Sequence, residues 1–299
     1  MPPPPPTPLE TYTLSPADHL SIFTTTILPT ELAPHHSHPH RASSGHRPLA
    51  VLILGQTGAG KTRLAPLLLA ALSRGGGDDS PPVHLIADTY KAYHPHYAVC
   101  LPAASADARK WLAMACEHVV ERRMDVLVES ACRYPGDFCE LVEIFGRGGY
   151  AVRVAVLAVP EGLSRLGILR RYYGGLEEGR GRLTPRGVHD ESYEGLREAV
   201  GWLDGRGGEG VVVVRRGNLL AHRGGGAAAA LEVERKRALT GEEREVAERD
   251  MEELRRLGDP GVDAQLQEIQ GLLDGLGSVD GGELQALRAD EFITDGLEA

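Results

Sequence analysis

One eight-residue stretch, residues 55–62, has the residue types and spacing needed to hold the phosphates of a nucleotide. It reads Gly55-Gln56-Thr57-Gly58-Ala59-Gly60-Lys61-Thr62 and fits the pattern Gly-x-x-x-x-Gly-Lys-Thr. Its three glycines allow backbone conformations in which consecutive N–H groups curl around phosphate oxygens. Lys61 is expected to reach the β- and γ-phosphates, and the Thr62 hydroxyl is expected to ligate Mg²⁺.

The residues on both sides of this stretch predict a strand, a loop and a helix in that order. The apolar run 49–54 has the composition and length of a buried strand. Residues 63–72 are typical of a helix, with Pro66 in or near its first turn. A helix that begins at the loop would add the positive end of its dipole to the phosphate site. The context therefore favours a nucleotide-binding loop over a chance Gly-rich segment.

Other residues supply the remaining parts of a phosphoryl-transfer site, which needs a base near the accepting hydroxyl and cations on the developing charge. Asp88 is the candidate base, and Glu129 is expected to support the metal or its waters. Arg171 and Arg182 are the candidate transition-state cations, because they flank a Gly-containing segment that could close over the γ-phosphate. The alternative interpretations are a helix N-cap for Asp88 and solvated surface positions for the two arginines.

Alternating apolar and amphipathic segments predict the fold that positions these residues. We expect an α/β protein with a mainly parallel sheet covered by helices on both faces. Strands are expected at 83–87, 126–128, 151–159 and 211–214, the last of these closing the sheet apart from a short strand or turn at 218–221; helices are expected at 104–123, 137–145, 160–173 and 186–203. Ligands of such sheets bind beyond the carboxyl ends of the strands, which is where Asp88 and Glu129 fall.

The chain ends are expected to form a helical arm and a helical tail. We divide the chain into a Pro-rich start, arm and linker (1–48), a P-loop domain (49–222), and a hinge with an acidic tail (223–299). The arm helix should begin at Ser15 and end before Pro29, and the histidines at 35–40 are interpreted as linker rather than metal site. In the tail, residues 224–230 are expected to be a flexible hinge, helices to begin at the Thr240–Glu243 capping box and to cover 263–273, and the final 25 or so residues to be frayed.

Charge and composition limit the partners and the compartment. The net charge is −10. The residues from Leu231 onward, with 19 acidic and 8 basic side chains, carry a charge of −11, so the residues before Leu231 carry about +1. The remaining region is close to neutral, which argues against nucleic acid as the main partner. The sequence shows neither a leader-like start nor a membrane-length apolar run, and its four cysteines have no metal-site spacing. We therefore expect a cytoplasmic protein with free thiols.

Six segments in order resemble the zeta toxin family. They are residues 55–62, 87–95 (Ala-Asp-Thr-Tyr-Lys-Ala-Tyr-His-Pro), 128–133 (Val-Glu-Ser-Ala-Cys-Arg), 149–160, 171–173 (Arg-Tyr-Tyr) and 182–190 (Arg-Leu-Thr-Pro-Arg-Gly-Val-His-Asp). The resemblance spans about 49–217, and the chain ends resemble those of a eukaryotic, fungal-type version. It implies a P-loop kinase fold with ATP and Mg²⁺. It also implies the activity of the bacterial members, phosphorylation of UDP-N-acetylglucosamine at the 3′-hydroxyl of the amino sugar.

Residue by residue, the resemblance implies a catalytic Asp for Asp88, the phosphate-loop Lys for Lys61, and the two γ-phosphate arginines for Arg171 and Arg182. Two sugar-contacting positions depart from the family pattern. Ala131 stands where a substrate-binding Thr is expected, and Ala113 aligns with an acidic residue.

A site that lacks such hydrogen-bonding groups loses discrimination for its substrate hydroxyl. A P-loop kinase with a different acceptor, and an inactive nucleotide-binding interaction protein, therefore stay open as alternatives. The acidic tail is a candidate surface for a protein partner or for self-inhibition over the nucleotide site.

Overall fold

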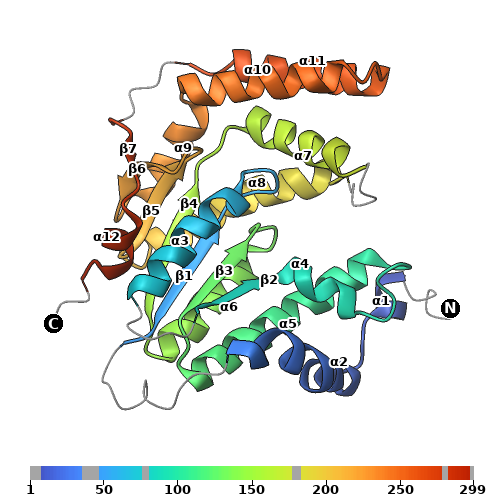
Figure 1. Cartoon of the computed structure of the whole chain (residues 1–299), viewed down its shortest axis with the longest axis vertical. Coiled ribbons are helices and arrows are strands. Elements are labelled where there is room, and N and C mark those ends of the chain that lie inside the picture. The colour runs from blue at the N-terminus through green and yellow to red at the C-terminus, as the bar shows by residue number, and fades with distance from the viewer. Residues whose placement is uncertain (1–7, 36–46, 76–80, 177–182, 278–281, 297–299) are drawn as a thin grey trace, which may run out of the picture.

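The computed structural model describes residues 8–35, 47–75, 81–176, 183–277 and 282–296 (Figure 1). Its centre is a seven-stranded sheet with the order β2-β3-β1-β4-β5-β6-β7. The strands are β1 (Leu49–Leu54), β2 (Val83–Ile86), β3 (Val126–Ser130), β4 (Ala151–Leu157), β5 (Val211–Arg215), β6 (Leu219–Arg223) and β7 (Gln285–Ala286). The first five pair in parallel, as the sequence predicts, so their carboxyl ends meet at one edge of the sheet.

Two antiparallel strands follow β5, so the prediction that β5 is the last strand of the sheet is wrong, whereas the short strand expected at 218–221 is present as β6. β6 pairs with β5, and β7 pairs with β6. The β5–β6 turn contains Gly217 and Asn218, whose φ angles of 76° and 57° are both in the left-handed region. Residue pairs with two positive φ values make the tight turns whose twist matches that of a hairpin.

Helices cover both faces of the sheet, as expected for a parallel α/β fold. Because strand side chains alternate between faces, Leu49, Val51 and Ile53 of β1 enter one core, whereas its even-numbered residues enter the other. The first core lies under α3 (Lys61–Gly75), α7 (Glu161–Leu176), α10 (Gly241–Arg255), α11 (Pro260–Asp274) and α12 (Ala289–Thr294). The second lies under α5 (Leu101–Arg122), α6 (Pro135–Arg147), α8 (Arg186–Asp204) and α9 (Ala227–Lys236). Within the described ranges, none of the helices is both long and apolar enough to cross a membrane.

The N-terminal arm packs on α5 through α1 (Pro8–Tyr12) and the helical run that follows it. Ser15 caps α2 (Pro16–Ile22), as predicted. The helix does not end before Pro29, because the chain continues as a π-helix, η1 (Phe23–Leu32), and a short 3₁₀ turn, η2 (Ala33–His35). Ile27 and Leu32 of η1 are fully buried, so core packing outweighs the break that proline favours.

The C-terminal tail is more ordered than its sequence predicts. The expected hinge is limited to a glycine turn, since α9 begins at Ala227, and within residues 282–296 the chain forms β7 and α12 rather than the expected frayed end. Phe292 and Ile293 are buried, and α12 packs on α3. The predicted capping box of Thr240 and Glu243 is present at the start of α10. In Figure 1 the orange helices α10 and α11 run along α7, on which they pack.

Candidate active site

The phosphate-loop motif connects β1 to α3, and Lys61 is the first residue of the helix. Gly58 and Gly60 have φ angles of 83° and 98°, which only glycine adopts without strain. A Cβ on Gly58 would lie 2.0 Å from the carbonyl oxygen of Ser164 in α7, so the loop also needs glycine for close packing. The structure therefore confirms the strand, loop and helix that the sequence predicts around the phosphate-loop motif.

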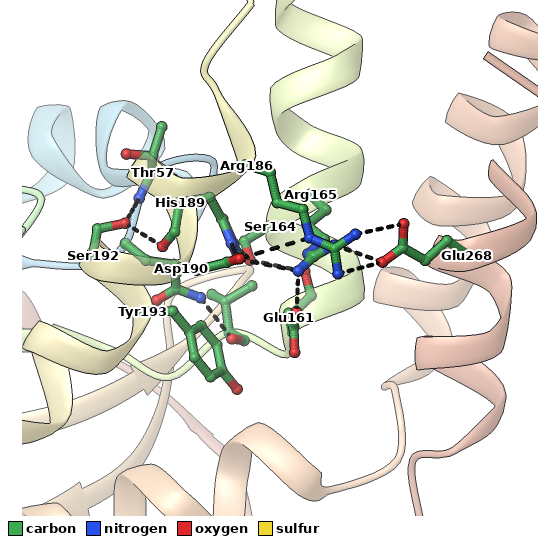
Figure 2. A network of polar contacts seen from close by, with 12 residues as sticks. Thr57, Glu161, Ser164, Arg165, Arg186, His189, Asp190, Ser192, Tyr193 and Glu268 are labelled. Carbon is green, nitrogen blue, oxygen red and sulfur yellow. Dashed lines mark hydrogen bonds and ion pairs between the residues drawn. The ribbon is translucent and has the colours of Figure 1, made fainter. Parts of the chain in front are cut away.

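Two side chains from outside the loop, and one from within it, fix its conformation. The Gln56 amide is buried and donates to the carbonyl of Val159 at 2.8 Å. The Thr57 N–H donates to the hydroxyl of Ser192 in α8 at 3.2 Å (Figure 2). Arg216 donates to the carbonyl of Gly58 at 2.7 Å. The loop is thus held by α8 and by the residues that follow β4 and β5.

Lys61 is the electrostatic centre of the site. Its Nζ donates to the carbonyl of Gly55 at 2.6 Å. Burial lowers the pKa of Lys61 to about 8, with Arg171 acting in the same direction and the carboxylates of Glu129 and Asp88 acting against it. The structure therefore brings four of the predicted residues within electrostatic range of one another.

The two carboxylates reach this edge from neighbouring strands. Asp88 lies in the short helix α4 (Ala87–Tyr90) directly after β2, and its Oδ1 is 2.6 Å from Nζ of Lys91. Glu129 lies in β3 beside Ile53 of β1, and its Oε1 is 3.0 Å from Nε2 of His84 in β2. The side chain of Asp88 is 75% exposed and that of Glu129 is 5% exposed, so only Asp88 is open to a second substrate.

Arg171 lies on α7 and is exposed. Its Nη2 donates to the hydroxyl of Thr184 at 2.9 Å, which ties α7 to the chain just before α8. Arg182, the second predicted cation, lies outside the described residues, as do the histidines at 36–40.

A cavity of about 570 Å³ opens beside the phosphate loop, between α3, α7 and α10. Four of its lining side chains are arginines and one is an aspartate, so the cavity suits an anionic ligand. The lining residues are Arg63, Arg170, Arg171, Gly174, Gly175, Arg249 and Asp250. The sequence offers no signal for the two residues of α10, which come from the tail.

A polar network joins the loop to α7, α8 and α11 (Figure 2). His189 is buried, with Nε2 2.8 Å from the Ser164 hydroxyl and Nδ1 3.0 Å from Oδ1 of Asp190. The set has the residue types of a hydrolase triad, but Ser164 is fully buried and also donates to the carbonyl of Glu161 at 2.9 Å. No substrate can reach that hydroxyl, so the network is structural.

The two residues predicted to take part in Mg²⁺ binding, Thr62 and Glu129, lie in α3 and β3. Among the described residues, no group of three or more His, Cys, Asp or Glu side chains is placed to hold a metal by itself. Mg²⁺ in kinases keeps several waters and takes phosphate oxygens with only one or two protein ligands. The exposed Thr62 hydroxyl in the first turn of α3, with Glu129 nearby, fits that kind of site.

The segment after β3 contains Ala131, where the family resemblance predicts a substrate-binding Thr. Cys132 has a φ angle of 57°, and its carbonyl would lie 2.1 Å from a Cβ on Gly195 of α8. The backbone after Glu129 is thus fixed in an unusual conformation. Ala131 is partly buried in this turn, whereas Ala113 packs against the apolar core on α5.

Comparisons with known proteins agree with this geometry. The family model described as Zeta toxin matches residues 36–224, which is more than half of the chain. Toxin PezT of Streptococcus pneumoniae serotype 4 is 26% identical over 157 residues, which are 49% of this chain and 60% of PezT. The chain therefore spans less than two thirds of the length of this curated relative.

Two solved structures share the fold. The first, from a study of the PezAT chromosomal toxin–antitoxin system of Streptococcus pneumoniae, has a TM-score of 0.62 at 18% identity and covers 81% of this chain and 98% of that one. The second, AvrRxo1-ORF1:-ORF2 with ATP, has a TM-score of 0.50 at 15% identity and covers 90% of this chain and 94% of that one.

Proposed function

Because the chain belongs to the zeta toxin family, a family of P-loop kinases, we propose that it transfers the γ-phosphate of ATP to a hydroxyl of a small molecule. One observation carries this proposal: Asp88, Glu129 and Arg171 all lie within electrostatic range of the phosphate-loop Lys61. Positioning and charge stabilisation are what phosphoryl transfer requires of a protein.

In the proposed mechanism the loop N–H groups and Lys61 hold the phosphates. The Asp88 carboxylate accepts the proton of the acceptor hydroxyl as its oxygen attacks the γ-phosphorus, and ADP leaves. Arg171, and Arg182 by its family position, stabilise the charge that develops on the transferred group. Thr62 and Glu129 would hold Mg²⁺, which neutralises phosphate charge when bound.

UDP-N-acetylglucosamine, through the 3′-hydroxyl of its amino sugar, is the first acceptor that we propose. Ala131 favours a different acceptor, because it lacks the hydroxyl that would contact the sugar. An inactive nucleotide-binding protein is the remaining alternative, and the retained set of Lys61, Asp88 and Arg171 argues against it.

The structure from the study of the PezAT toxin–antitoxin system supports a protein partner as a further proposal. Self-inhibition by the tail is the competing proposal, since Asp250 of α10 lines the cavity and lies 3.6 Å from Arg170. Asp250→Ala should tighten ATP binding if the tail inhibits, and should weaken or not change it if α10 is simply a wall of the site.

The direct test is ATP consumption by the purified protein with and without UDP-N-acetylglucosamine, with Lys61→Ala as the blank. A phosphorylated UDP-sugar would establish the proposed acceptor. ATP binding without sugar-dependent turnover would exclude that acceptor and direct the search to a panel of antibiotics, nucleosides and other sugar nucleotides. Absence of both binding and turnover would contradict the kinase assignment.

A further inference from the structure

Arg216 contacts the phosphate loop through the backbone carbonyls of Gly58 and Ala59. It directly follows β5 and reaches from the carboxyl end of that strand to the loop. Its Nη2 donates to the carbonyl of Gly58 at 2.7 Å and to that of Leu163 in α7 at 2.9 Å, and its Nε donates to the carbonyl of Ala59 at 3.4 Å. One guanidinium group therefore joins three structural elements: the end of β5, the loop and α7.

This contact depends on two glycines that let the backbones of the loop and α7 meet. A Cβ on Gly167 of α7 would lie 2.6 Å from the carbonyl oxygen of Gly58 and 3.0 Å from Nη2 of Arg216. Gly58 would clash in return with the carbonyl of Ser164. Arg171 stands one helical turn after Gly167, on the same face of α7. The contacts of Arg216 with the loop and with α7 thus fix the position of Arg171 relative to the loop.

The Arg216 guanidinium also places a positive charge next to the loop, on the side of its Gly58 and Ala59 carbonyls. All three of its hydrogen-bond acceptors are carbonyl oxygens rather than carboxylates. Burial lowers the pKa of Arg216 to about 10, with Glu243 and Asp250 acting against that and Arg63 adding to it. The group therefore keeps its charge at neutral pH. In a trans peptide group the N–H points opposite to the C=O, so an Arg216 contact with the Ala59 carbonyl directs the Gly60 N–H to the other side of the loop, where we expect the phosphates.

We propose that Arg216 is a positioning residue for phosphoryl transfer, which holds the carbonyls of Gly58 and Ala59 away from the phosphates and locks α7, with Arg171, against the loop. This inference rests on the proposed kinase function. The planar guanidinium has donors that diverge toward two backbones at once, and a lysine ammonium does not reproduce that geometry.

The test compares wild-type protein with Arg216→Lys and with a matched control, Arg153→Lys. Arg153 also uses its guanidinium to bind backbone carbonyls, donating to Phe292 at 3.1 Å and Val152 at 3.2 Å, but it lies in β4 near α12, away from the loop. Equilibrium binding of a fluorescent ATP analogue, ATP turnover and the melting temperature are measured for each. Gly167→Ala provides a second variant that disturbs the same junction while the Arg216 side chain itself is retained.

For Arg216→Lys and Gly167→Ala we expect nucleotide affinity and kcat each to fall by about 10- to 100-fold, as misplacement of catalytic groups by about 1 Å produces. Arg153→Lys should lower the melting temperature and leave both functional values within about twofold of wild type.

Wild-type values in Arg216→Lys, or equal functional losses in the Arg153 control, would overturn the inference. If wild-type protein binds no nucleotide, the proposed function fails first and this inference with it. Binding and turnover by the wild type that persist unchanged in both junction variants would overturn the inference alone.

Discussion

Asp88 and Glu129 illustrate how two residues of the same charge take different roles at one sheet edge. Glu129 is enclosed between β1 and β2, and its carboxylate contacts the His84 ring. Its charge is therefore placed to interact with the loop, and with a metal if one binds there. Asp88 projects into solvent from the end of β2 and is oriented by Lys91. Because a general base must touch the incoming hydroxyl, exposure favours Asp88 for proton transfer.

Asp88→Ala should therefore lower kcat by about 10²- to 10⁴-fold, the usual contribution of a general base, and leave ATP affinity nearly unchanged. Turnover under saturating substrate and binding of a fluorescent ATP analogue check the two values separately. Asp274→Asn, which alters an exposed carboxylate at the end of α11, is the control. Undiminished turnover in Asp88→Ala would remove Asp88 from the mechanism.

Lys61 predicts a pH dependence. Since its pKa is lowered to about 8, the amine is charged below that pH and loses its charge above it in the ligand-free protein. The value of kcat/KM for ATP should stay level toward neutral pH and fall as pH rises through about 8, because this parameter reports groups of the free enzyme.

The neighbours of Lys61 give this pH profile a sharper test. Glu129→Gln removes a carboxylate that raises the pKa of Lys61, so the alkaline fall should move to lower pH; Arg171→Gln should move it to higher pH. A fall that does not move in either variant would show that another group titrates.

At the residue level, the sequence predicts those site positions that belong to a local pattern. The loop residues and Asp88 follow recognisable strands, and the structure brings them together. His84, Ser192 and Arg216 were missed because each is a single residue in its own segment, with no spacing to mark it. Their roles exist only after distant elements pack, so tertiary structure alone identifies them.

At the scale of elements, α11 connects α7 and α8. These two helices lie on either side of the Gly-containing segment that is predicted to close over the γ-phosphate. Glu268 of α11 lies 2.9 Å from Nη1 of Arg165 in α7 and 2.7 Å from Nη2 of Arg186, the first residue of α8 (Figure 2). A single carboxylate thus bridges the helices that precede and follow the segment containing Arg182.

Glu268→Gln should loosen this bridge at a small global cost, about 0.2–1 kcal/mol per exposed ion pair. Hydrogen exchange should accelerate at the start of α8 and in α7 while β1 stays protected, since local opening need not unfold the sheet. Glu252→Gln, which breaks an exposed pair with Arg256 in α10, is the matched control. Equal exchange in both variants would show that Glu268 has no special role.

Element boundaries were predicted well where periodicity is strong and poorly where packing decides. The strands β1 to β5 and the helices α5 to α8 lie where the alternation places them. The arm continues past Pro29 because buried Ile27 and Leu32 hold it to α5 and its neighbours. The sequence predicted a frayed end because α12 has only two large apolar side chains, Phe292 and Ile293. In the folded protein α12 packs on α3, which stabilises it.

At the scale of the whole molecule, the tail is part of the core rather than an appendage. Leu231, Met251, Leu266 and Phe292 are buried against the sheet and its helices. Each large apolar side chain contributes about 1.5–3 kcal/mol by burial, and a domain has only about 5–15 kcal/mol to lose. A chain shortened after Gly226 is therefore expected to unfold, and cannot report on self-inhibition.

Phe292→Ala is the milder version of that experiment. It should lower the free energy of unfolding by about 3–5 kcal/mol, the usual cost of truncating a buried phenylalanine. Leu257→Ala, at a position that is 52% exposed, should change it by no more than about 0.5 kcal/mol. Denaturant unfolding followed by circular dichroism measures both, and similar values for the two variants would contradict the core role of α12.

The place of α12 and β7 has a consequence for a chain that is still being made. A ribosome makes the phosphate loop more than 200 residues before β7 and α12, which pair with β6 and pack on α3. Contacts between such distant parts of a sequence form late in folding. The phosphate loop should thus reach its native surroundings only after residues 285–294 have left the ribosome, so that nucleotide binding by a growing chain is delayed until β7 and α12 can pack.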